Sequence, residues 1–186
     1  DADCVALLPH AALRVFVMGD RAERREPATP DDCRAMTVLV KEALEAGAIG
    51  ISTSRLLSHR DSLGELAPHV QMGHEELFAL AEGLRAAGKG IFQLAAGFAN
   101  QSLASVLPGA ASSTAEDAAR DEIDLMAEIC RRSGRPLSFS LSINNDLPNL
   151  ARYILSLVEE ANREPGIQIS VQVFPRPTGI LYGLDL

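Results

Sequence analysis

The sequence predicts an α/β fold in which parallel strands alternate with helices. Short apolar runs follow one another along the chain, separated by longer segments whose apolar residues recur every three or four positions. The first pattern is typical of buried strands and the second of amphipathic helices. The apolar runs are continuous, as expected for strands covered on both faces, and their alternation with helices favours right-handed βαβ units.

About five or six strands are expected from the apolar runs. These runs are Cys4–Leu8, Arg14–Met18, Ala48–Ser52, Ile91–Ala95, Leu137–Leu141 and Ile167–Phe174.

The clearest helix start lies at Thr29, a residue type that caps helices, with Pro30 in the first turn and two aspartates after it. Helical spacing of apolar residues then continues to Gly47. Three further helices are predicted over the ranges Glu75–Ala87, Ala115–Ser133 and Leu147–Arg163. The segments 53–73 and 97–114 are polar or irregular, and we expect loops there.

The residue pattern by itself leaves two architectures open, a doubly wound open sheet and a closed barrel. No Gly-x-Gly-x-x-Gly turn or phosphate-binding loop follows a predicted strand, which removes the main support for a nucleotide-binding sheet. A complete (β/α)8 barrel needs roughly 250 residues. This chain has 186 residues, so a barrel fold would be a partial one.

The composition indicates a globular protein, with 47% hydrophobic and 23% charged residues. The net charge of −8 argues against binding to nucleic acid or to an anionic membrane surface. No apolar stretch reaches the ~20 residues of a membrane helix, and no signal peptide is recognisable. Cys4, Cys33 and Cys130 lack zinc-finger spacing, and we expect reduced thiols in a cytoplasmic protein.

Three parts of the sequence carry a resemblance to a known family. They are Leu7–His10 with Leu13–Gly19, Glu42–Ser54, and Gln172–Gly179. Together they resemble the central part of the N-acyl-D-amino-acid deacylases (D-aminoacylases), a branch of the metal-dependent amidohydrolase superfamily. The resemblance implies a partial TIM (β/α)8 barrel. Residues 1–186 would form the central portion of a single barrel domain, with flanking strands and a small β-domain outside this chain.

The resemblance also implies a reaction, hydrolysis of the linear carbon–nitrogen (amide) bond of an N-acyl-D-amino acid. Zinc is the implied cofactor, because it lowers the pKa of bound water to about 7 and polarises a carbonyl group. Alignment with the family places the His-x-His ligands before Asp1 and the catalytic aspartate after Leu186. We therefore expect this chain alone to be inactive.

The two remaining histidine ligands of the family fall at Leu94 and Leu141, so the resemblance leaves no metal ligand in this chain. An alternative hypothesis follows, in which the protein is a metal-free or non-catalytic relative without zinc. Such a relative would bind a small carboxylate ligand at the barrel mouth.

Polar residues at or after the ends of the predicted strands are the candidates for binding a small-molecule substrate, an N-acyl amino acid or a related amide. The substrate-binding candidates are Arg55, Arg60, Gln93, Ser140 and Arg176. Arginine binds carboxylates through paired hydrogen bonds, and serine and glutamine can orient an amide. The other strand-end candidates are His10, Ser52, Ser54 and Asn144. The alternative for each of them is a structural role, as a hydrogen-bonded residue of a loop or of a filled interior.

Two further groups of titratable residues are predicted to lie at the surface. His59, His69 and His74 lack the spacing of a metal site and fall in or beside a polar loop. Glu75 and Glu76 fall on a predicted helix away from the strand ends, and we expect both to face solvent.

Overall fold

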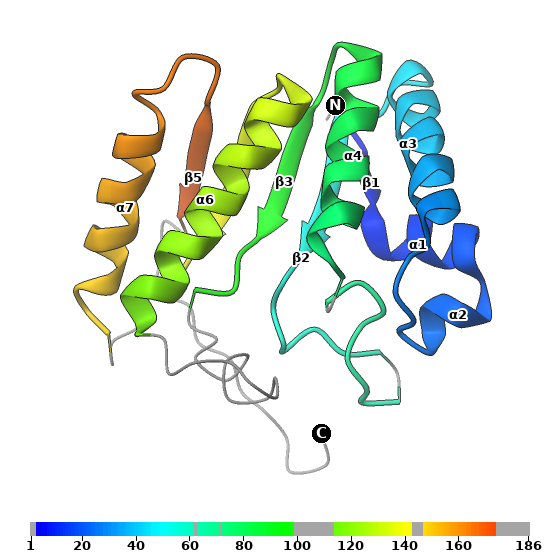
Figure 1. Ribbon diagram of the computed structural model, residues 1–186, viewed down its shortest axis with the longest axis horizontal. Helices are drawn as coiled ribbons and strands as arrows, with labels where there is room; N and C mark the ends of the chain where they lie inside the picture. The colour runs from blue at the N-terminus through cyan, green and yellow to red at the C-terminus, as the bar shows by residue number, and fades with distance from the viewer. Residues whose placement is uncertain (1–2, 62, 71, 99–113, 143–146, 174–186) are drawn as a thin grey trace.

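A computed structural model of the protein describes residues 3–61, 63–70, 72–98, 114–142 and 147–173. Within these residues five strands form one sheet, in the order in which they follow along the chain (Figure 1). The strands are β1 (Leu7–Pro9), β2 (Gly50–Ser54), β3 (Ile91–Ala95), β4 (Leu137–Leu141) and β5 (Ile169–Val173). Every neighbouring pair is parallel, which confirms the predicted alternation of parallel strands and helices.

Six helices are described between the strands. They are α1 (His10–Met18), α2 (Asp20–Glu23), α3 (Pro30–Glu45), α4 (His74–Ala87), α6 (Ala115–Ser133) and α7 (Leu150–Ala161). Thr29 caps α3 as predicted, because its hydroxyl oxygen accepts a hydrogen bond from the backbone N–H of Asp32. None of the helices in the described part of the chain combines the length and the apolar character that a membrane span requires.

The arrangement of the helices decides between the two predicted architectures. Figure 1 shows α3, α4, α6 and α7 side by side on one face of the sheet, and successive helices pack against each other. In a doubly wound sheet the strand order reverses and helices cover both faces. Here the order runs unbroken from β1 to β5, which is the arrangement in the wall of a (β/α) barrel.

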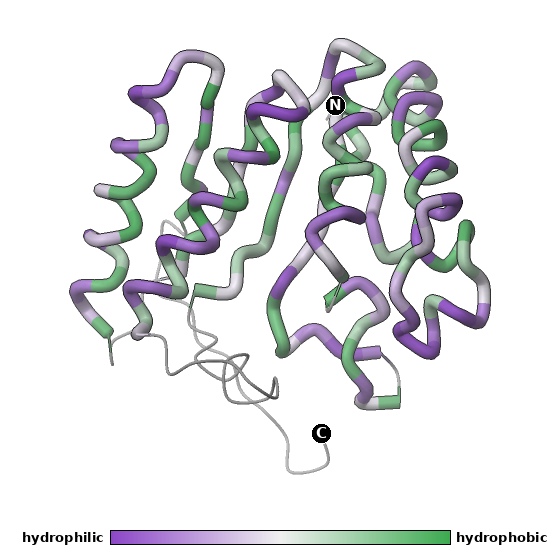
Figure 2. The backbone as a smooth tube through the Cα atoms, in the orientation of Figure 1, coloured by the Kyte–Doolittle hydropathy of each residue, from purple (hydrophilic) through white to green (hydrophobic). Residues whose placement is uncertain are grey.

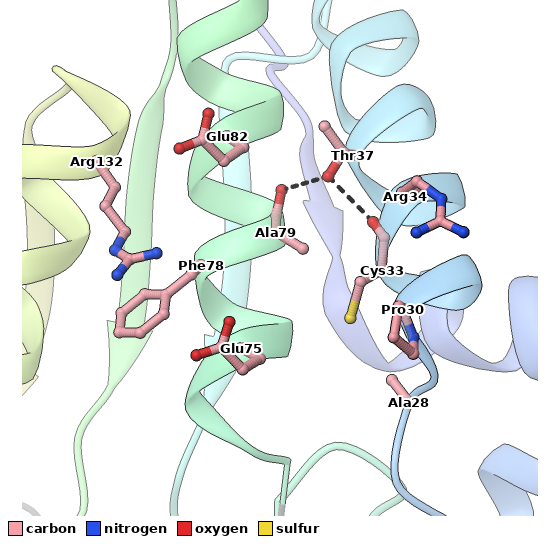
Figure 3. Close-up of a pocket in the computed structure, with 10 residues that line it drawn as sticks. All are labelled: Ala28, Pro30, Cys33, Arg34, Thr37, Glu75, Phe78, Ala79, Glu82 and Arg132. Carbon is pink, nitrogen blue, oxygen red and sulfur yellow. Dashed lines mark hydrogen bonds between the residues drawn. The ribbon is translucent and has the colours of Figure 1, made fainter.

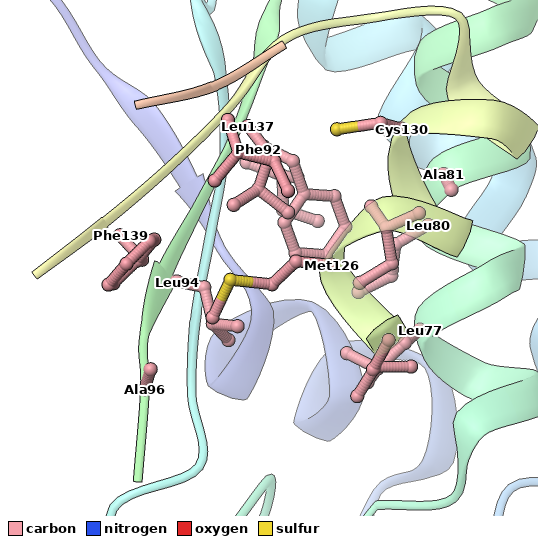
Figure 4. Close-up of a cluster of buried hydrophobic side chains, with 14 of the residues drawn as sticks. Leu77, Leu80, Ala81, Phe92, Leu94, Ala96, Met126, Cys130, Leu137 and Phe139 are labelled. Carbon is pink, nitrogen blue, oxygen red and sulfur yellow. The ribbon is translucent and has the colours of Figure 1, made fainter. Parts of the chain in front are cut away.

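The core lies between the sheet and these helices. Phe92 and Leu94 of β3 are fully buried and point toward Met126 of α6 and Leu80 of α4 (Figure 4). Figure 2 shows hydrophobic and hydrophilic residues alternating along α6 and α7, as expected for helices with one buried face. The helices therefore cover one face of the sheet with apolar side chains, and the opposite face belongs to the barrel interior.

The predicted strand at Arg14–Met18 is wrong, because these residues belong to α1. The buried residues of α1 are His10, Leu13, Arg14 and Met18, and their spacing of three, one and four positions fits a helix. The sequence pattern was misleading because two of these four positions are polar, while Phe16, in the middle of the apolar run, is 78% exposed.

Candidate functional site

The face of the sheet opposite the helices carries two rows of mainly polar residues. Residues that pair across parallel strands point to the same face, and successive residues of a strand alternate between faces. Since Phe92 and Leu94 face the helices, Gln93 and Ala95 face the barrel interior. The register then gives one row of Ser52, Gln93, Ser138 and Ser170, and a second row of Ser54, Ala95, Ser140 and Gln172.

This register brings together four of the predicted site residues. Ser52 and Gln93 are direct neighbours in the first row, and Ser54 and Ser140 lie on either side of Ala95 in the second. Ser52, Gln93 and Ser140 are half-buried, whereas Ser54 is buried and its hydroxyl oxygen accepts a hydrogen bond from the N–H of Leu56. The geometry therefore offers uncharged hydrogen-bonding groups on this face, from the middle to the carboxyl ends of β2, β3 and β4.

The sequence interpretation missed three members of these rows, Ser138, Ser170 and Gln172. The available signal was an alternation with a period of two, which places Ser138 and Ser140 on one face of β4 and Ser170 and Gln172 on the same face of β5. Ser138 is buried, and the two residues of β5 are exposed.

Leu94 and Leu141, which the family resemblance aligned with histidine ligands, lie in the hydrophobic core. Leu94 is fully buried and Leu141 is 3% exposed. The register places Leu94 on the helix-covered face, beside Phe139 of β4. Leu141 is two residues beyond Phe139 and therefore shares its face. Both side chains thus point away from the face that carries Gln93 and Ser140.

Arg55 follows β2 directly, but its guanidinium group is engaged with α6. Its Nε lies 2.9 Å from both carboxylate oxygens of Glu122. Together the two residues form part of the wall of a cavity of about 470 Å³, which His74 and three other acidic residues of α6 also line. Sequence reasoning gave no sign of this ion pair, because 67 positions separate its partners.

Arg60, Arg176 and Asn144 are the remaining predicted site residues apart from His10. Arg60 is exposed, and its Nη1 donates a hydrogen bond of 3.0 Å to the carbonyl oxygen of Gly64 within its own loop. Asn144 and Arg176 lie outside the described residues, so their roles remain predictions.

His10 lies at the carboxyl end of β1, as predicted, where it is fully buried in a polar cluster. Its Nδ1 lies 2.8 Å from the Thr53 hydroxyl of β2, and its Nε2 donates to Oε1 of Glu76 at 2.8 Å. The same carboxylate oxygen accepts a 2.8 Å hydrogen bond from Nε of Arg14. His10 therefore ties β1, β2 and α4 together, which is the structural alternative stated for this residue.

Two surface predictions are corrected by this cluster. Glu76 is 2% exposed and His69 is 8% exposed, so neither residue faces solvent. Glu76 lies in the first turn of α4 next to the core residue Leu77, on the side of the helix that packs inward. The pKa of His69 is lowered to about 4, chiefly because burial disfavours the charged ring and then because His10, His59 and Arg14 add positive charge nearby.

The described residues offer no set of ligands for a metal ion. No group of three or more histidine, cysteine, aspartate or glutamate side chains among them could hold a metal ion. The interior-facing residues near the strand ends are serine, glutamine and alanine, which are not zinc ligands. The part of the chain that the structure describes therefore does not fit a zinc centre.

A separate cavity of about 450 Å³ lies on the helical side, between α3 and α4 (Figure 3). Thr37 of α3 lines this cavity and donates a hydrogen bond of 2.9 Å to the carbonyl oxygen of Ala79 in α4. The guanidinium carbon of Arg132 stands 3.9 Å from the centre of the Phe78 ring. Burial raises the pKa of the Cys33 thiol, so this thiol is not activated as a nucleophile.

Comparison with known proteins supports the barrel architecture. No protein-family model and no curated protein sequence matches the chain. Two solved structures match 90% of it, each with a TM-score of 0.62 and 23% sequence identity. One is a crystal structure of D-aminoacylase said to define a novel subset of amidohydrolases, and the other is a D-aminoacylase mutant in complex with copper chloride.

The chain spans 29% of the length of each of these structures. Its described residues form a sheet of five parallel strands in unbroken order, with helices on one face. The chain therefore has the fold of a partial α/β barrel, and the predicted resemblance to D-aminoacylase is confirmed at the level of the fold.

Proposed function

We propose that this chain is the central portion of the barrel of a hydrolase that acts on linear carbon–nitrogen bonds. N-acyl-D-amino acids are the proposed substrate class. The observation that supports the proposal is the match of 90% of the chain to D-aminoacylase structures, in a region whose interior face carries rows of serine and glutamine. Such groups can donate to the carbonyl oxygen of an amide and accept from its N–H group.

The proposal assigns binding and orientation to this chain. Ser52, Gln93 and Ser140 are half-buried on the interior face, where they can hold an amide without placing a charge beside it. Arg60 and Arg176 are the proposed partners of the substrate carboxylate. Arg55, whose Nε is engaged by Glu122, is proposed to hold the segment after β2 in place. Activation of the attacking water is left to other parts of a longer protein, since the described residues offer no metal site.

The test uses the full-length protein and measures release of the free amino acid from N-acyl-D-amino acids, with the L-isomers as comparison. Replacing Gln93 by Leu removes hydrogen bonds to the amide, and loss of one such bond costs about 1.4 kcal/mol, so kcat/KM should fall about tenfold. Ser156→Ala on the exposed face of α7 is the matched control and should leave kcat/KM unchanged.

Metal analysis of the same preparation distinguishes the two hypotheses. Turnover together with a stoichiometric metal supports the hydrolase. Binding of N-acyl-amino acids without turnover or metal would reject it in favour of a non-catalytic carboxylate-binding relative. Turnover that Gln93→Leu leaves unchanged would reject the proposed binding face.

A further inference from the structure

Four buried side chains, His10, Arg14, His69 and Glu76, form a cluster that we name the latch cluster. Its members come from α1, from the loop after β2 and from the first turn of α4. The side chains of Arg14 and Glu76 are 2% and 3% exposed, respectively. Burying charged groups is costly unless they pair with each other, so a cluster of this kind stabilises the fold only while its pairings are intact.

The latch cluster has one feature that the proposed function does not use. Two of its buried atoms, Nδ1 of His69 and Oε2 of Glu76, have no hydrogen-bond partner among the described residues. The other carboxylate oxygen of Glu76 accepts from both His10 and Arg14. At neutral pH His69 is uncharged, because its pKa is lowered to about 4, and its ring contacts that of His10 edge-on at 5.9 Å between centroids.

The latch cluster fastens the 63–70 segment to the body of the protein. Arg14 donates from Nη1 to the carbonyl oxygen of Pro68, and His69 and Val70 are buried beside it. Outside the cluster the segment is held by Arg25, whose Nε donates to the carbonyl oxygen of Leu66 at 2.8 Å. The opposite end is open to solvent, since Leu63 is 85% exposed. Further bonds hold the segment within its own loop, such as the one from the Ala67 N–H to the carbonyl oxygen of His59, and the cluster supplies a buried attachment to α1.

We propose that the latch cluster controls the attachment of the 63–70 segment in a proton-dependent way. The segment is bound at neutral pH (the closed state) and is released when His69 takes up a proton (the open state). The added proton places a positive charge in a buried site, on a ring whose Nδ1 makes no hydrogen bond with the described residues. The inference goes beyond the proposed function, because it concerns the loop and requires no substrate.

The charges around His69 support this direction. His10 and Arg14 of α1 and His59 of the same loop disfavour a charged His69, while Glu76 of α4 favours it, and burial is the largest effect. The pKa of His69 is therefore lowered from 6.5 to about 4 in the closed state. Because the pKa of His69 is lowered in the closed state, His69 binds a proton more tightly in the open state than in the closed state. The stabilisation of the closed state is complete above pH 6.5 and is lost as the pH falls toward 4.

The test is amide hydrogen exchange of the full-length protein at several pH values, corrected for the intrinsic exchange rate and compared with α6 as an internal reference. With a pKa of about 4 closed and 6.5 open, protection of the 63–70 segment should fall about 20-fold between pH 7 and pH 5. Protection of α6 should stay unchanged. The His69→Phe variant keeps a ring but cannot be protonated, and it should abolish the pH dependence. His59→Phe, at an exposed position of the same loop, should retain it.

A titration of the His69 ring by NMR in the unmodified full-length protein gives a readout that requires no variant to fold. A midpoint near that of the loss of protection supports the proposal. Protonation of His69 without loss of protection would overturn it, and so would an equal loss of protection in His69→Phe. Since no substrate enters the measurement, a negative result here does not reject the proposed function. In the same way, a negative deacylase assay does not reject the proton-dependent release of the 63–70 segment.

Discussion

Glu75 and Glu76 are adjacent in sequence and lie in the same first turn of α4, but their environments differ completely. Glu75 is exposed, whereas Glu76 is 2% exposed and accepts hydrogen bonds from His10 and Arg14. The helix dipole favours a negative charge at both positions. Only Glu76 also neutralises a buried guanidinium group, so the two residues form a natural pair for measuring what the buried contact contributes.

We expect Glu76→Gln to lower the free energy of unfolding at pH 7 by about 3 kcal/mol, because Arg14 would keep a buried charge without a counter-charge. The matched variant Glu75→Gln removes the same charge from the same turn and should change stability by less than about 0.5 kcal/mol. Denaturant unfolding followed by circular dichroism measures both values. Equal effects in the two variants would show that the helix dipole, and not the buried pair, governs this turn.

At the scale of elements, the contact between α3 and α4 depends on a glycine. A Cβ atom added at Gly83 would lie 2.6 Å from Cβ of Val40 and 2.9 Å from the carbonyl oxygen of Thr37. Both distances are too short for real contacts, and the second involves backbone that cannot move aside easily. Gly83 therefore allows the two helices to approach closely, and Thr37 bridges them through its hydrogen bond to Ala79.

We predict that Gly83→Ala lowers the free energy of unfolding by about 1–3 kcal/mol through overpacking. Helix propensity alone predicts the opposite sign, because alanine is favoured over glycine in a helix by about 1 kcal/mol. The reverse change Ala86→Gly, at an exposed position of the same helix, measures that propensity separately. A Gly83→Ala protein more stable than the parent in a thermal melt would refute the close-approach argument.

At the scale of the whole molecule, the sheet of the described residues ends at β1 on one side and β5 on the other. Unpaired strand edges expose backbone donors and acceptors that can pair with another chain. Val173 of β5 is 60% exposed, and Phe16 and Val5 near β1 are 78% and 71% exposed. We therefore predict that the isolated chain associates and is poorly soluble.

Charge placed on an edge strand opposes such pairing. We expect Val173→Lys on β5 to shift the isolated chain toward the monomer in sedimentation velocity. Leu155→Lys adds the same charge on the exposed face of α7, where residue 155 is 41% exposed, and should have a much smaller effect. If both variants reduce association equally, net charge and not the sheet edge controls solubility. A parent chain that is monomeric at all concentrations would contradict the prediction itself.

The sequence by itself determined the alternation of strands and helices and most element positions, because these depend on apolar spacing and on local signals such as the Thr29 cap. It also pointed to Ser52, Gln93 and Ser140 as residues at the carboxyl ends of strands. The two rows on the interior face required the register, since pairing between strands decides which of these side chains are neighbours.

Only the tertiary structure made a helix of Arg14–Met18 and buried Glu76 and His69. The physical reason is the same in each case. A polar residue looks solvent exposed in a sequence pattern, and its burial becomes favourable only when a distant partner satisfies it. For Arg14 that partner lies 62 positions away, and no local spacing encodes the contact.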